Sequence, residues 1–520
     1  MTFRLTRRAF LGAAALMLSA VSLAAIAGTA SAAESNALVI ANGSQPPSLD
    51  PHVTTISTAN TIARNIFETL VSLDADMKIQ PALAESWTAS EDGRKYRFTL
   101  RPGVKFHNGQ PLTPNDVIAS LERWGAYSLA GKNIFQDATW SAEGENTVVL
   151  TLPVPRFNVL LTLAPAFTQS AVIMPASVVK AAGNKPATEI IGTGPFRLVD
   201  WQVDRMIELV RNDEYTSFGG EQSGSAGDRT PKFDKLRIEF VSDESTRTLG
   251  LSTGEYDMAN PVAFDSISEI LSDDNLKLGS YPGVLLNLGF NYGKPGIFRD
   301  VGARRAINIG LERQSILVAT AVDRKFYRLN NHLMMLWQKQ WSADVGTTEF
   351  NPGLVGEARA LLAAAGYDGK ELIFITTRDD AEMYSSAIVI QQQLQALGLN
   401  VKLESYDWST FVKVRADKDA WDLIVMAAGQ KADPTQLIFL NKDFPGGAQD
   451  ATLEDILARF RKAETMEQAQ ELYRELETWN QEYIPSVRIG EIDYPFAMSK
   501  RVEAIQLQYD PIPWTARLTN

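Results

Sequence analysis

The chain contains no cysteine and only three histidines among its 520 residues. The lack of cysteine excludes disulfides, thiolate zinc sites and cysteine nucleophiles. The histidines His52, His107 and His332 lie far apart in the sequence, so a histidine-rich metal site is not expected. Basic residues are also in the minority, because 62 Asp and Glu outnumber 50 Lys and Arg and leave a net charge of −12. This charge argues against nucleic acid as the main partner.

After the first 32 residues, no stretch is long and apolar enough to predict a membrane span. Residues 1–32 contain three arginines and no acid, and their Ala- and Leu-rich run ends at Ala30-Ser31-Ala32. This order is typical of a cleaved export signal. Thr6-Arg7-Arg8-Ala9-Phe10-Leu11 resembles the twin-arginine signal, and an ordinary secretory signal is the alternative. We expect cleavage near Ala32 and a soluble periplasmic protein of charge −15, since three positive charges are removed from −12.

One segment, residues 371–433, has the pattern of a parallel α/β unit. Its apolar runs Leu372–Ile375, Val401–Tyr406 and Leu423–Met426 are separated by two helical patterns, of which the second covers Trp408–Arg415. The first helix is predicted from five apolar residues spaced by four, three, four and three positions, which are Met383, Ala387, Ile390, Leu394 and Leu397. A β-α-β-α-β order implies parallel strands with a ligand crevice at their carboxyl ends.

The rest of the chain is mixed α+β, and its length predicts two or three structural units. Alternation around Tyr96, Phe98 and Leu100 indicates a half-buried strand, and Thr113-Pro114 indicates the start of a helix. Runs at Val284–Phe290 and Ser486–Ile489 are interpreted as two strands that cross between lobes, as a hinged clamp requires.

Several motifs occur in the order and spacing of one family. They are Ser48–Pro51, Ile66–Leu70, Pro81–Trp87, Phe98–Gly109, Gly192–Phe196, Arg211-Asn212, Gly254–Asp257, Arg304–Ile307 and Leu311–Arg313. On these blocks the chain resembles an extracytoplasmic solute-binding protein of the peptide/nickel class, which supplies an ABC importer. The resemblance implies a binding protein without catalysis, with a peptide or small-molecule ligand and the ABC permease subunits as partners. It implies no cofactor, and we expect a monomer.

The same resemblance implies a two-lobed periplasmic binding protein fold with an extra inserted domain and two hinge crossings. We expect residues 1–32 to be the export signal. Lobe I would combine residues 33–63, 186–285 and 487–520. The inserted α+β domain would span 64–185, and lobe II, with its parallel unit, 286–486.

An exported enzyme such as a hydrolase is the main alternative from another class. The sequence has no Gly-x-Ser-x-Gly elbow, no His-Glu-x-x-His pair and no cysteine nucleophile, so no catalytic residue is assigned. Paired carboxylates of the glycosidase type remain open. A chaperone or sensor on the same fold is a third hypothesis. Within the binding class, an oligosaccharide, opine, haem or nickel chelate remains an alternative to a peptide.

The first candidate site is the loop Gly429-Gln430-Lys431-Ala432-Asp433-Pro434 after the last strand of the parallel unit. In peptide-binding relatives an aspartate in a Gly-x-x-x-Asp-Pro loop receives the ligand's amino group, which implies this role for Asp433. A helix cap is the alternative, because Asp433, Pro434 and Gln436 also fit N-cap, N1 and N3 positions. Lys431 would favour a ligand with an anionic or hydroxyl-rich end, unless its side chain lies in solvent.

Three further residues are candidates for ligand contact. Arg378 follows the first strand of the unit and could bind a carboxylate, although the acids beside it could neutralise it at a helix entry. Trp408 lies after the second strand, and Thr55 could reach the cleft from the amino-terminal loop. The segment Phe326–Trp341 lacks the glycine and prolines of the family and is rich in Met and Trp, which favours core packing over a sugar platform.

Overall fold

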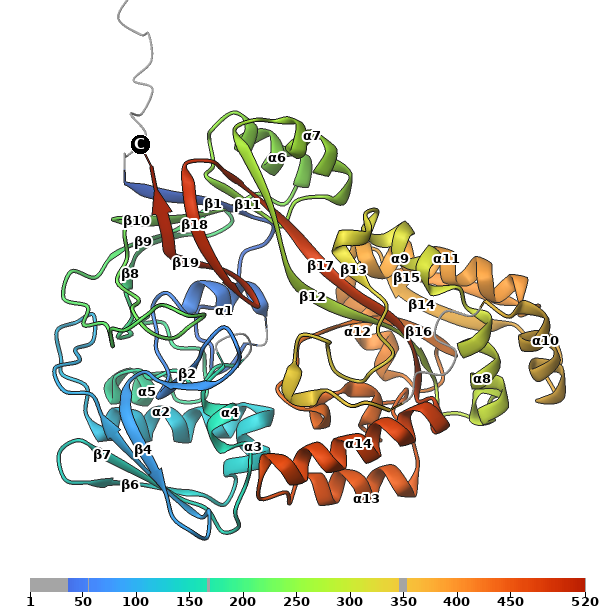
Figure 1. Cartoon of the computed structure of the whole chain (residues 1–520), viewed down its shortest axis with the longest axis horizontal. Coiled ribbons are helices and arrows are strands. Elements are labelled where there is room, and N and C mark those ends of the chain that lie inside the picture. The colour runs from blue at the N-terminus through green and yellow to red at the C-terminus, as the bar shows by residue number, and fades with distance from the viewer. Residues whose placement is uncertain (1–35, 55, 166–168, 346–352, 520) are drawn as a thin grey trace, which may run out of the picture.

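Two long antiparallel strands connect the two halves of the molecule (Figure 1). They are β12 (Leu276–Phe290) and β17 (Ser486–Ser499), which pair along almost their whole length. The computed structural model describes residues 36–519 except 55, 166–168 and 346–352. The pairing of β12 with β17 confirms the two predicted crossings as neighbouring strands of one sheet, and the molecule is two-lobed.

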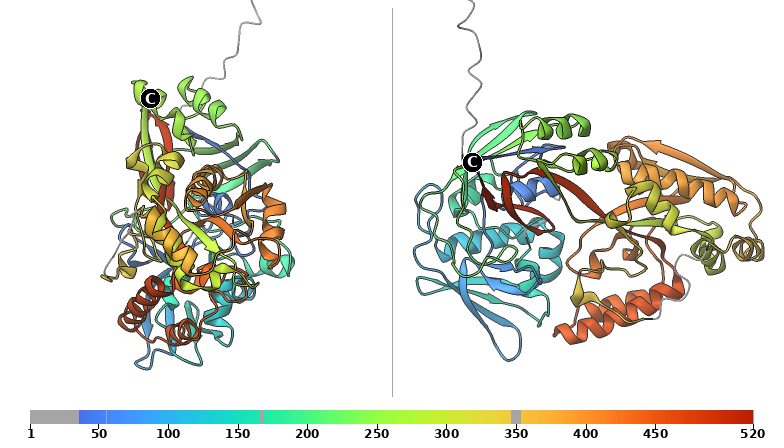
Figure 2. Two further views of the ribbon diagram at one scale, coloured as in Figure 1. Left: turned by 90° about the vertical axis from the view of Figure 1, so that its right-hand side faces the viewer. Right: turned by 45° about the horizontal axis from the view of Figure 1, so that its top comes forward.

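A single large sheet runs through both lobes in the order β15-β14-β16-β12-β17-β11-β1-β10-β9-β8, and β13 also pairs with β17. On the side of the parallel unit lie β14 (Leu372–Thr377), β15 (Val401–Tyr406) and β16 (Leu423–Gly429). On the other side lie β1 (Ala37–Asn42), β8 (Phe196–Gln202), β9 (Met206–Arg211), β10 (Lys235–Phe240) and β11 (Met258–Asn260). The short β13 is Tyr327-Arg328. Figure 2 shows, with the top turned forward, β12 and β17 as the link between these two groups.

The parallel unit forms as the sequence predicts. The strand β14 pairs in parallel with both β15 and β16. The helix α11 (Ala381–Ala396) buries Met383, Ala387, Ile390 and Leu394 against the sheet, and Gly398 with φ +93° ends it in the left-handed conformation. Other helices of this lobe are α8 (Val301–Gly310), α9 (Arg313–Ala321), α10 (Val355–Ala364) and α12 (Trp408–Ala416).

A second core of the same lobe is built on a helical pair. The helices α13 (Ala451–Phe460) and α14 (Met466–Tyr483) bury Phe460, Tyr473 and Leu476 against Met334 and Trp341. Short 3-10 turns surround this pair, namely η4 (Lys339–Trp341), η5 (Pro434–Gln436) and η6 (Ile438–Leu440). The α-helix implied by the cap positions at Asp433, Pro434 and Gln436 is therefore wrong in type, because the backbone forms two separate 3-10 turns there.

The amino-terminal half carries a four-stranded antiparallel sheet in the order β4-β5-β7-β6. Its strands are β4 (Ala84–Ala89), β5 (Lys95–Leu100), β6 (Thr139–Glu143) and β7 (Thr147–Thr151), with the hairpin β2 (Val71–Leu73) and β3 (Ile79–Pro81) beside it. The helix α2 (Pro114–Tyr127) covers this sheet, and its predicted start is confirmed, since Thr113 N–H donates to Asp116 Oδ2 at 2.9 Å.

The remaining elements complete the amino-terminal half and the sides of the crossing strands. They are α1 (Ser57–Ala63), α3 (Leu129–Phe135), α4 (Val159–Leu163), α5 (Ala176–Ala182), α6 (Glu244–Ser252), α7 (Ile267–Ser272), η1 (Phe264–Ser266), η2 (Ile297–Arg299), η3 (Arg324–Phe326), β18 (Val502–Gln508) and β19 (Asp510–Leu518). In the part of the chain that the structure describes, no helix is both long enough and apolar enough to cross a membrane.

Both crossing strands are longer than the apolar runs that indicated them. Gly279, Pro282 and Gly283 interrupt the pattern of β12, and Gly490 and Pro495 interrupt that of β17. The pairing tolerates these residues through irregularities between Pro282 and Val284 and between Leu286 and Asn287. Glycine and proline, which usually mark turns, thus occur inside both strands. The apolar pattern of the sequence therefore underestimates the length of each strand.

Candidate ligand-binding site between the lobes

The loop from Gly429 to Asp433 leaves β16 at its carboxyl end and is held in place on two sides. Gln430 Nε2 donates to the Pro282 carbonyl oxygen of the crossing strand β12 at 3.1 Å. Gln338 Nε2 donates to the Lys431 carbonyl oxygen at 2.8 Å. The Trp341 indole N–H donates to the Ala432 carbonyl oxygen at 2.9 Å. These bonds fix the backbone of the loop and leave the Lys431 side chain available for other contacts.

A first cavity, which we call the lysine cavity, lies on one side of this loop and contains about 290 Å³ of empty space, including its open mouth. Its walls come from parts of the chain far apart in sequence, which are Leu73, Met77, Leu161, Pro165, Trp337, Gln338, Gln340, Gln430, Lys431, Ala432 and Tyr509. Among the described residues of this lining, Lys431 alone carries a charge. Burial without a neighbouring acid lowers the pKa of Lys431.

Two aromatic rings from different lobes meet at the lysine cavity. Trp337 and Tyr509 lie with ring centroids 5.8 Å apart at 70°, and the Tyr509 hydroxyl is 3.5 Å from Met77 Sδ. Tyr509 occupies the tight turn between β18 and β19 with φ +69°, a conformation that bulky L residues rarely adopt. Such a strained position is typical of functional sites, where the surrounding structure maintains it.

A second cavity, the aspartate cavity, lies around Asp433 and contains about 410 Å³ of empty space, including its open mouth. Asp433 is 5% exposed and caps η5, because its Oδ1 accepts from the Thr435 backbone N–H at 2.9 Å. Its Oδ2 accepts from Asn158 Nδ2 of the amino-terminal half at 3.4 Å. Burial raises the pKa of Asp433, and the bonds from Thr435 and Asn158 oppose this rise. The cap alternative is thus confirmed as one role of the residue.

The two lobes also touch beside the aspartate cavity. Phe157, just before α4, places its ring 5.5 Å from Phe460 and 6.2 Å from Trp341, both in edge-to-face geometry. The Phe157 backbone N–H donates to the Ala463 carbonyl oxygen at 3.2 Å. In Figure 1, α3 and α4 lie next to α13 and α14 at this contact. The site is therefore bounded by the crossing strands at one end and by Phe157 at the other.

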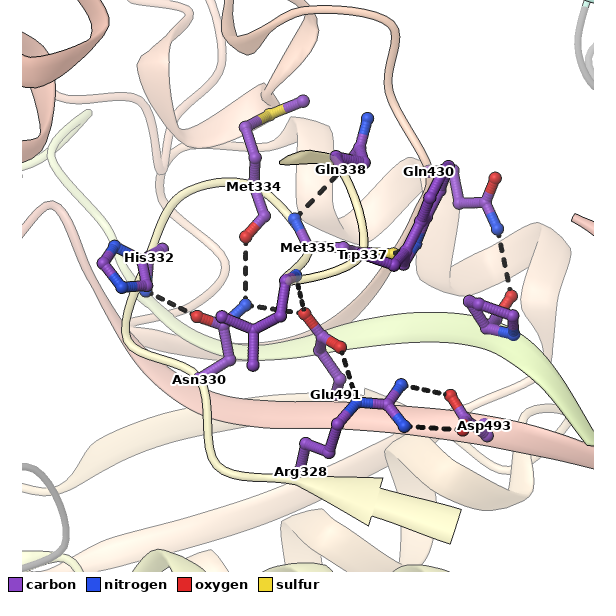
Figure 3. Close-up of polar contacts among 12 residues, drawn as sticks. Arg328, Asn330, His332, Met334, Met335, Trp337, Gln338, Gln430, Glu491 and Asp493 are labelled. Carbon is purple, nitrogen blue, oxygen red and sulfur yellow. Dashed lines mark hydrogen bonds and ion pairs between the residues drawn. The ribbon is translucent and has the colours of Figure 1, made fainter. Parts of the chain in front are cut away.

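The segment that carries Trp337 is attached to the crossing strand β17 by charged side chains (Figure 3). Arg328 Nε donates to Glu491 Oε2 at 3.1 Å, and its two terminal nitrogens pair with the Asp493 carboxylate, one of them at 2.7 Å. The other Glu491 oxygen accepts from Asn330 Nδ2 at 2.8 Å and from the Leu336 backbone N–H at 2.6 Å. Glu491 is 2% exposed, so this anchor is buried.

The Met- and Trp-rich segment thus has two roles that follow from its two faces. Met334 and Trp341 pack into the core under α13 and α14, as the composition favoured. Trp337 instead lines the lysine cavity, with its indole N–H 3.3 Å from Met335 Sδ. The core interpretation is therefore confirmed for most of the segment and is wrong for Trp337.

Arg378 and Trp408 lie at the carboxyl ends of β14 and β15, on the same edge of the sheet as Gly429. Arg378 is exposed and its guanidinium donates to the Ser405 carbonyl oxygen at 3.0 Å, while Trp408 is 48% exposed and packs on Phe411. Neither lines the lysine or the aspartate cavity. Gly429 is exposed at the start of the loop, and Thr55 lies outside the described residues. Ligand contact by these residues stays a prediction.

Sequence reasoning missed Tyr509, Asn158 and Met77. All three reach the site from the amino-terminal half or the carboxyl-terminal hairpin, and no local pattern marks them. Two other features of the sequence, His107 and the motif that begins at Gly192, have structural roles. His107 bridges the turn before β8, with Nε2 3.0 Å from the Gly194 carbonyl oxygen, and Gly192 packs against the Ile66 backbone. Within the described ranges, no cluster of three or more His, Asp or Glu could hold a metal ion.

Comparison with known proteins identifies the class. Residues 78–449 match the family described as bacterial extracellular solute-binding proteins, family 5 Middle. This match covers more than half of the chain, so the protein belongs to that family. It is a solute-binding protein of the bacterial cell exterior and not an enzyme, which removes the hydrolase alternative.

Individual relatives agree with this class. The chain is 27% identical, over 89% of its length and 90% of the relative's, to a "probable peptide ABC transporter periplasmic-binding protein" of Sinorhizobium fredii. It is 28% identical to a glutathione-binding protein of Salmonella typhi over 75% of this chain and 73% of that one. Its fold matches the ABC transporter-associated periplasmic binding protein DppA of Helicobacter pylori, in complex with the peptide STSA, with a TM-score of 0.76. That match has 22% identity and covers 93% of this chain and 98% of the other.

Proposed function

We propose that this protein is the substrate-binding component of an ABC importer and captures a peptide or peptide-like solute between its lobes. The observation that carries the proposal is the loop from Gly429 to Asp433, which is flanked by two cavities with walls from both lobes. The relative of Sinorhizobium fredii and the glutathione-binding proteins, which are named for peptide ligands, support this ligand class.

The physical sequence of events is capture, closure and delivery. A solute that contacts residues of both lobes binds the closed form more tightly, and this differential affinity shifts the protein toward closure. The closed form would then be presented to the permease subunits. The energy for transport would come from a separate ATPase, since the chain has no Gly-x-x-x-x-Gly-Lys-Ser/Thr loop.

Export and organisation complete the proposal. Residues 1–32 would direct the chain to the periplasm by the twin-arginine route, with cleavage near Ala32. Lobe I would comprise 33–63, 186–285 and 487–520, the inserted domain 64–185, and lobe II 286–486. Separate hydrophobic cores around Phe98 and Phe374 support the inserted domain and lobe II, while the core around Phe196 also includes Ile66 and Val172 of the inserted range. The mature protein would act as a monomer.

The test begins with protein purified from an exporting host. Native protein is denatured, the released solutes are identified by mass spectrometry, and the refolded protein is titrated with them and with a peptide library by calorimetry. We expect peptides among the released solutes and saturable rebinding. Release and rebinding of only sugars, haem or a metal chelate would refute the peptide assignment.

Asp433 is tested in the same titration with a pair of substitutions. Asp433→Asn keeps a side-chain oxygen for the Thr435 cap but removes the charge, whereas Asp433→Ala removes both. We expect both variants to bind peptide about 10-fold or more weakly, because an ammonium–carboxylate bond is lost. The exposed Asp443→Asn serves as the control for net charge. Normal binding by Asp433→Asn would show that Asp433 is a cap alone.

A further inference from the structure

The lysine cavity differs from a second charged cavity of the molecule, because the charge in the lysine cavity has no partner among the described residues. A polar cavity in the amino-terminal half contains Arg64, Glu68 and Arg229, and these charges are paired there. Arg229 lies 3.6 Å from Glu68, and Arg64 pairs with Asp510. Within the part of the chain that the structure describes, Lys431 has neither a hydrogen-bond acceptor nor an acidic partner for its ammonium.

An unpaired ammonium in a recess is costly unless something compensates it. A group transferred from water into a protein interior loses hydration, and opposite charge or hydrogen bonds must replace it. Among the described residues that line the cavity none is acidic, so an anion that pairs with Lys431 in this recess would come from a bound solute. The half-buried position of Lys431 therefore points to an anionic group on the solute.

A second polar atom in the cavity also lacks a partner. Gln430 Nε2 is held by the Pro282 carbonyl oxygen, which leaves Gln430 Oε1 buried without a hydrogen bond among the described residues. Figure 3 shows Gln430 beside Trp337, with its amide nitrogen directed to the crossing strand. A buried acceptor of this kind calls for an N–H or O–H donor.

The rest of the lining is apolar or aromatic. Trp337 and Tyr509 meet edge to face, and Met77, Leu73 and Leu161 complete the apolar part of the lining. Methionine and aromatic side chains together accommodate apolar groups of varied shape.

From these observations we propose that the lysine cavity binds the carboxylate-bearing end of the solute. Lys431 would hold the carboxylate, Gln430 Oε1 would accept from an adjacent N–H or O–H, and the apolar side group would pack against the outer surface of the Trp337–Tyr509 pair. The solute class is thus an organic acid with a neighbouring donor and an apolar group, such as the carboxyl end of a short peptide. This inference rests on the proposed solute-binding function and specifies the ligand end at one wall of its site.

The experiment compares matched acids and amides on the intact mature protein. The probes are di- and tripeptides, single amino acids and hydroxy acids, each with a free carboxylate, together with the corresponding primary amides. Binding is screened by thermal shift and quantified by calorimetry. We expect free acids to bind about 10- to 100-fold more tightly than their amides, as a charge-assisted bond predicts.

Three variants localise the effect to Lys431. In Lys431→Gln the advantage of acid over amide should largely vanish, and in Lys431→Arg it should be largely retained. Lys339→Gln is the matched control, because Lys339 lies on the neighbouring exposed surface outside the cavity lining and carries the same charge. An unchanged acid preference in Lys431→Gln would overturn the proposal, as would amides that bind as tightly as acids.

The outcomes separate this inference from the proposed function. Binding of amino acids or hydroxy acids but of no peptide would refute the peptide assignment and support the carboxylate site. Equal binding of peptide acids and peptide amides would support the peptide assignment and refute the carboxylate site. A protein stabilised by none of the acids would count against both.

Discussion

Glu491 offers a test of how the site is connected to the strands that join the lobes. This residue lies on β17, where the strand pairs with β12 on one side and with β13 on the other. Its two carboxylate oxygens accept from Arg328, Asn330 and the Leu336 backbone N–H. The same segment continues to Trp337 and to Gln338, which holds the Lys431 carbonyl oxygen. Glu491→Gln should therefore loosen the segment that positions the loop.

The size of the effect follows from the hydrogen bond that the substitution removes. A glutamine at position 491 can still accept from Asn330 and Leu336 with its oxygen, but its amide nitrogen would face the Arg328 donor. A charge-assisted hydrogen bond contributes about 1.5–3 kcal/mol to stability. Arg328 keeps its pair with Asp493, so the loss belongs to the lower part of this range. A local cost of about 2 kcal/mol corresponds to about 30-fold more frequent opening.

Amide hydrogen exchange followed by mass spectrometry measures this opening segment by segment. We expect peptides covering residues 329–341 to exchange about 30-fold faster in Glu491→Gln, while peptides of α11 and β5 keep their rates. Ligand affinity, measured by calorimetry, should fall with the same variant, because Trp337 and the loop lose part of their preorganisation.

Two controls decide whether the reasoning holds. Asp493→Asn removes charge from the same strand but touches only Arg328, so it should affect residues 329–341 less than Glu491→Gln. Glu503→Gln, on an exposed site of β18, should have no effect. Unchanged exchange of residues 329–341 in Glu491→Gln, or an equal effect of Asp493→Asn, would refute the proposed attachment.

Two further predictions concern pH and closure. Burial and the neighbouring Asp380 raise the pKa of Glu382 to about 8, so the folded state binds more protons than the unfolded state between pH 4.5 and 8. The free energy of unfolding should therefore fall as pH rises through this window. Thermal melts of Glu382→Gln should show a smaller decrease in stability over the same pH range. Identical pH profiles of the variant and the wild type would contradict this prediction. Phe157→Ala removes the ring between Phe460 and Trp341, and we expect the closed population to fall about 10-fold at a cost of about 1–2 kcal/mol. Small-angle scattering without ligand would show expansion, and an unchanged radius of gyration would exclude this role.

The local elements were predictable because their signals are local. The apolar pattern of α11, the glycine after its end and the alternation of β5 are each set by neighbouring residues in the sequence. The parallel unit followed from the order of its segments. The lengths of β12 and β17 could not be predicted in the same way, because their glycines and prolines are tolerated through pairing with a strand about 200 residues away.

The candidate site was only half predictable for the same reason. The loop from Gly429 to Asp433 follows a recognisable strand, so its position at the sheet edge could be predicted. The opposite walls come from Met77, Asn158 and Tyr509, whose approach depends on how the lobes pack. Tyr509 in particular gives no sequence signal, since its placement results from a left-handed turn between two hairpin strands.

The magnitudes explain why a charge and an apolar wall would both be needed at the lysine cavity. Moving a two-state equilibrium from 1:99 to 99:1 takes about 5.5 kcal/mol of differential affinity. A bond between Lys431 and a carboxylate supplies about 1.5–3 kcal/mol, and each aromatic contact adds about 0.5–1.5 kcal/mol. Neither contribution alone reaches the required value. Because Trp337 and Tyr509 belong to different lobes in the proposed division, a solute that contacts both rings would do so only in the closed form, and the aromatic pair would then be the closure-specific part of the binding energy.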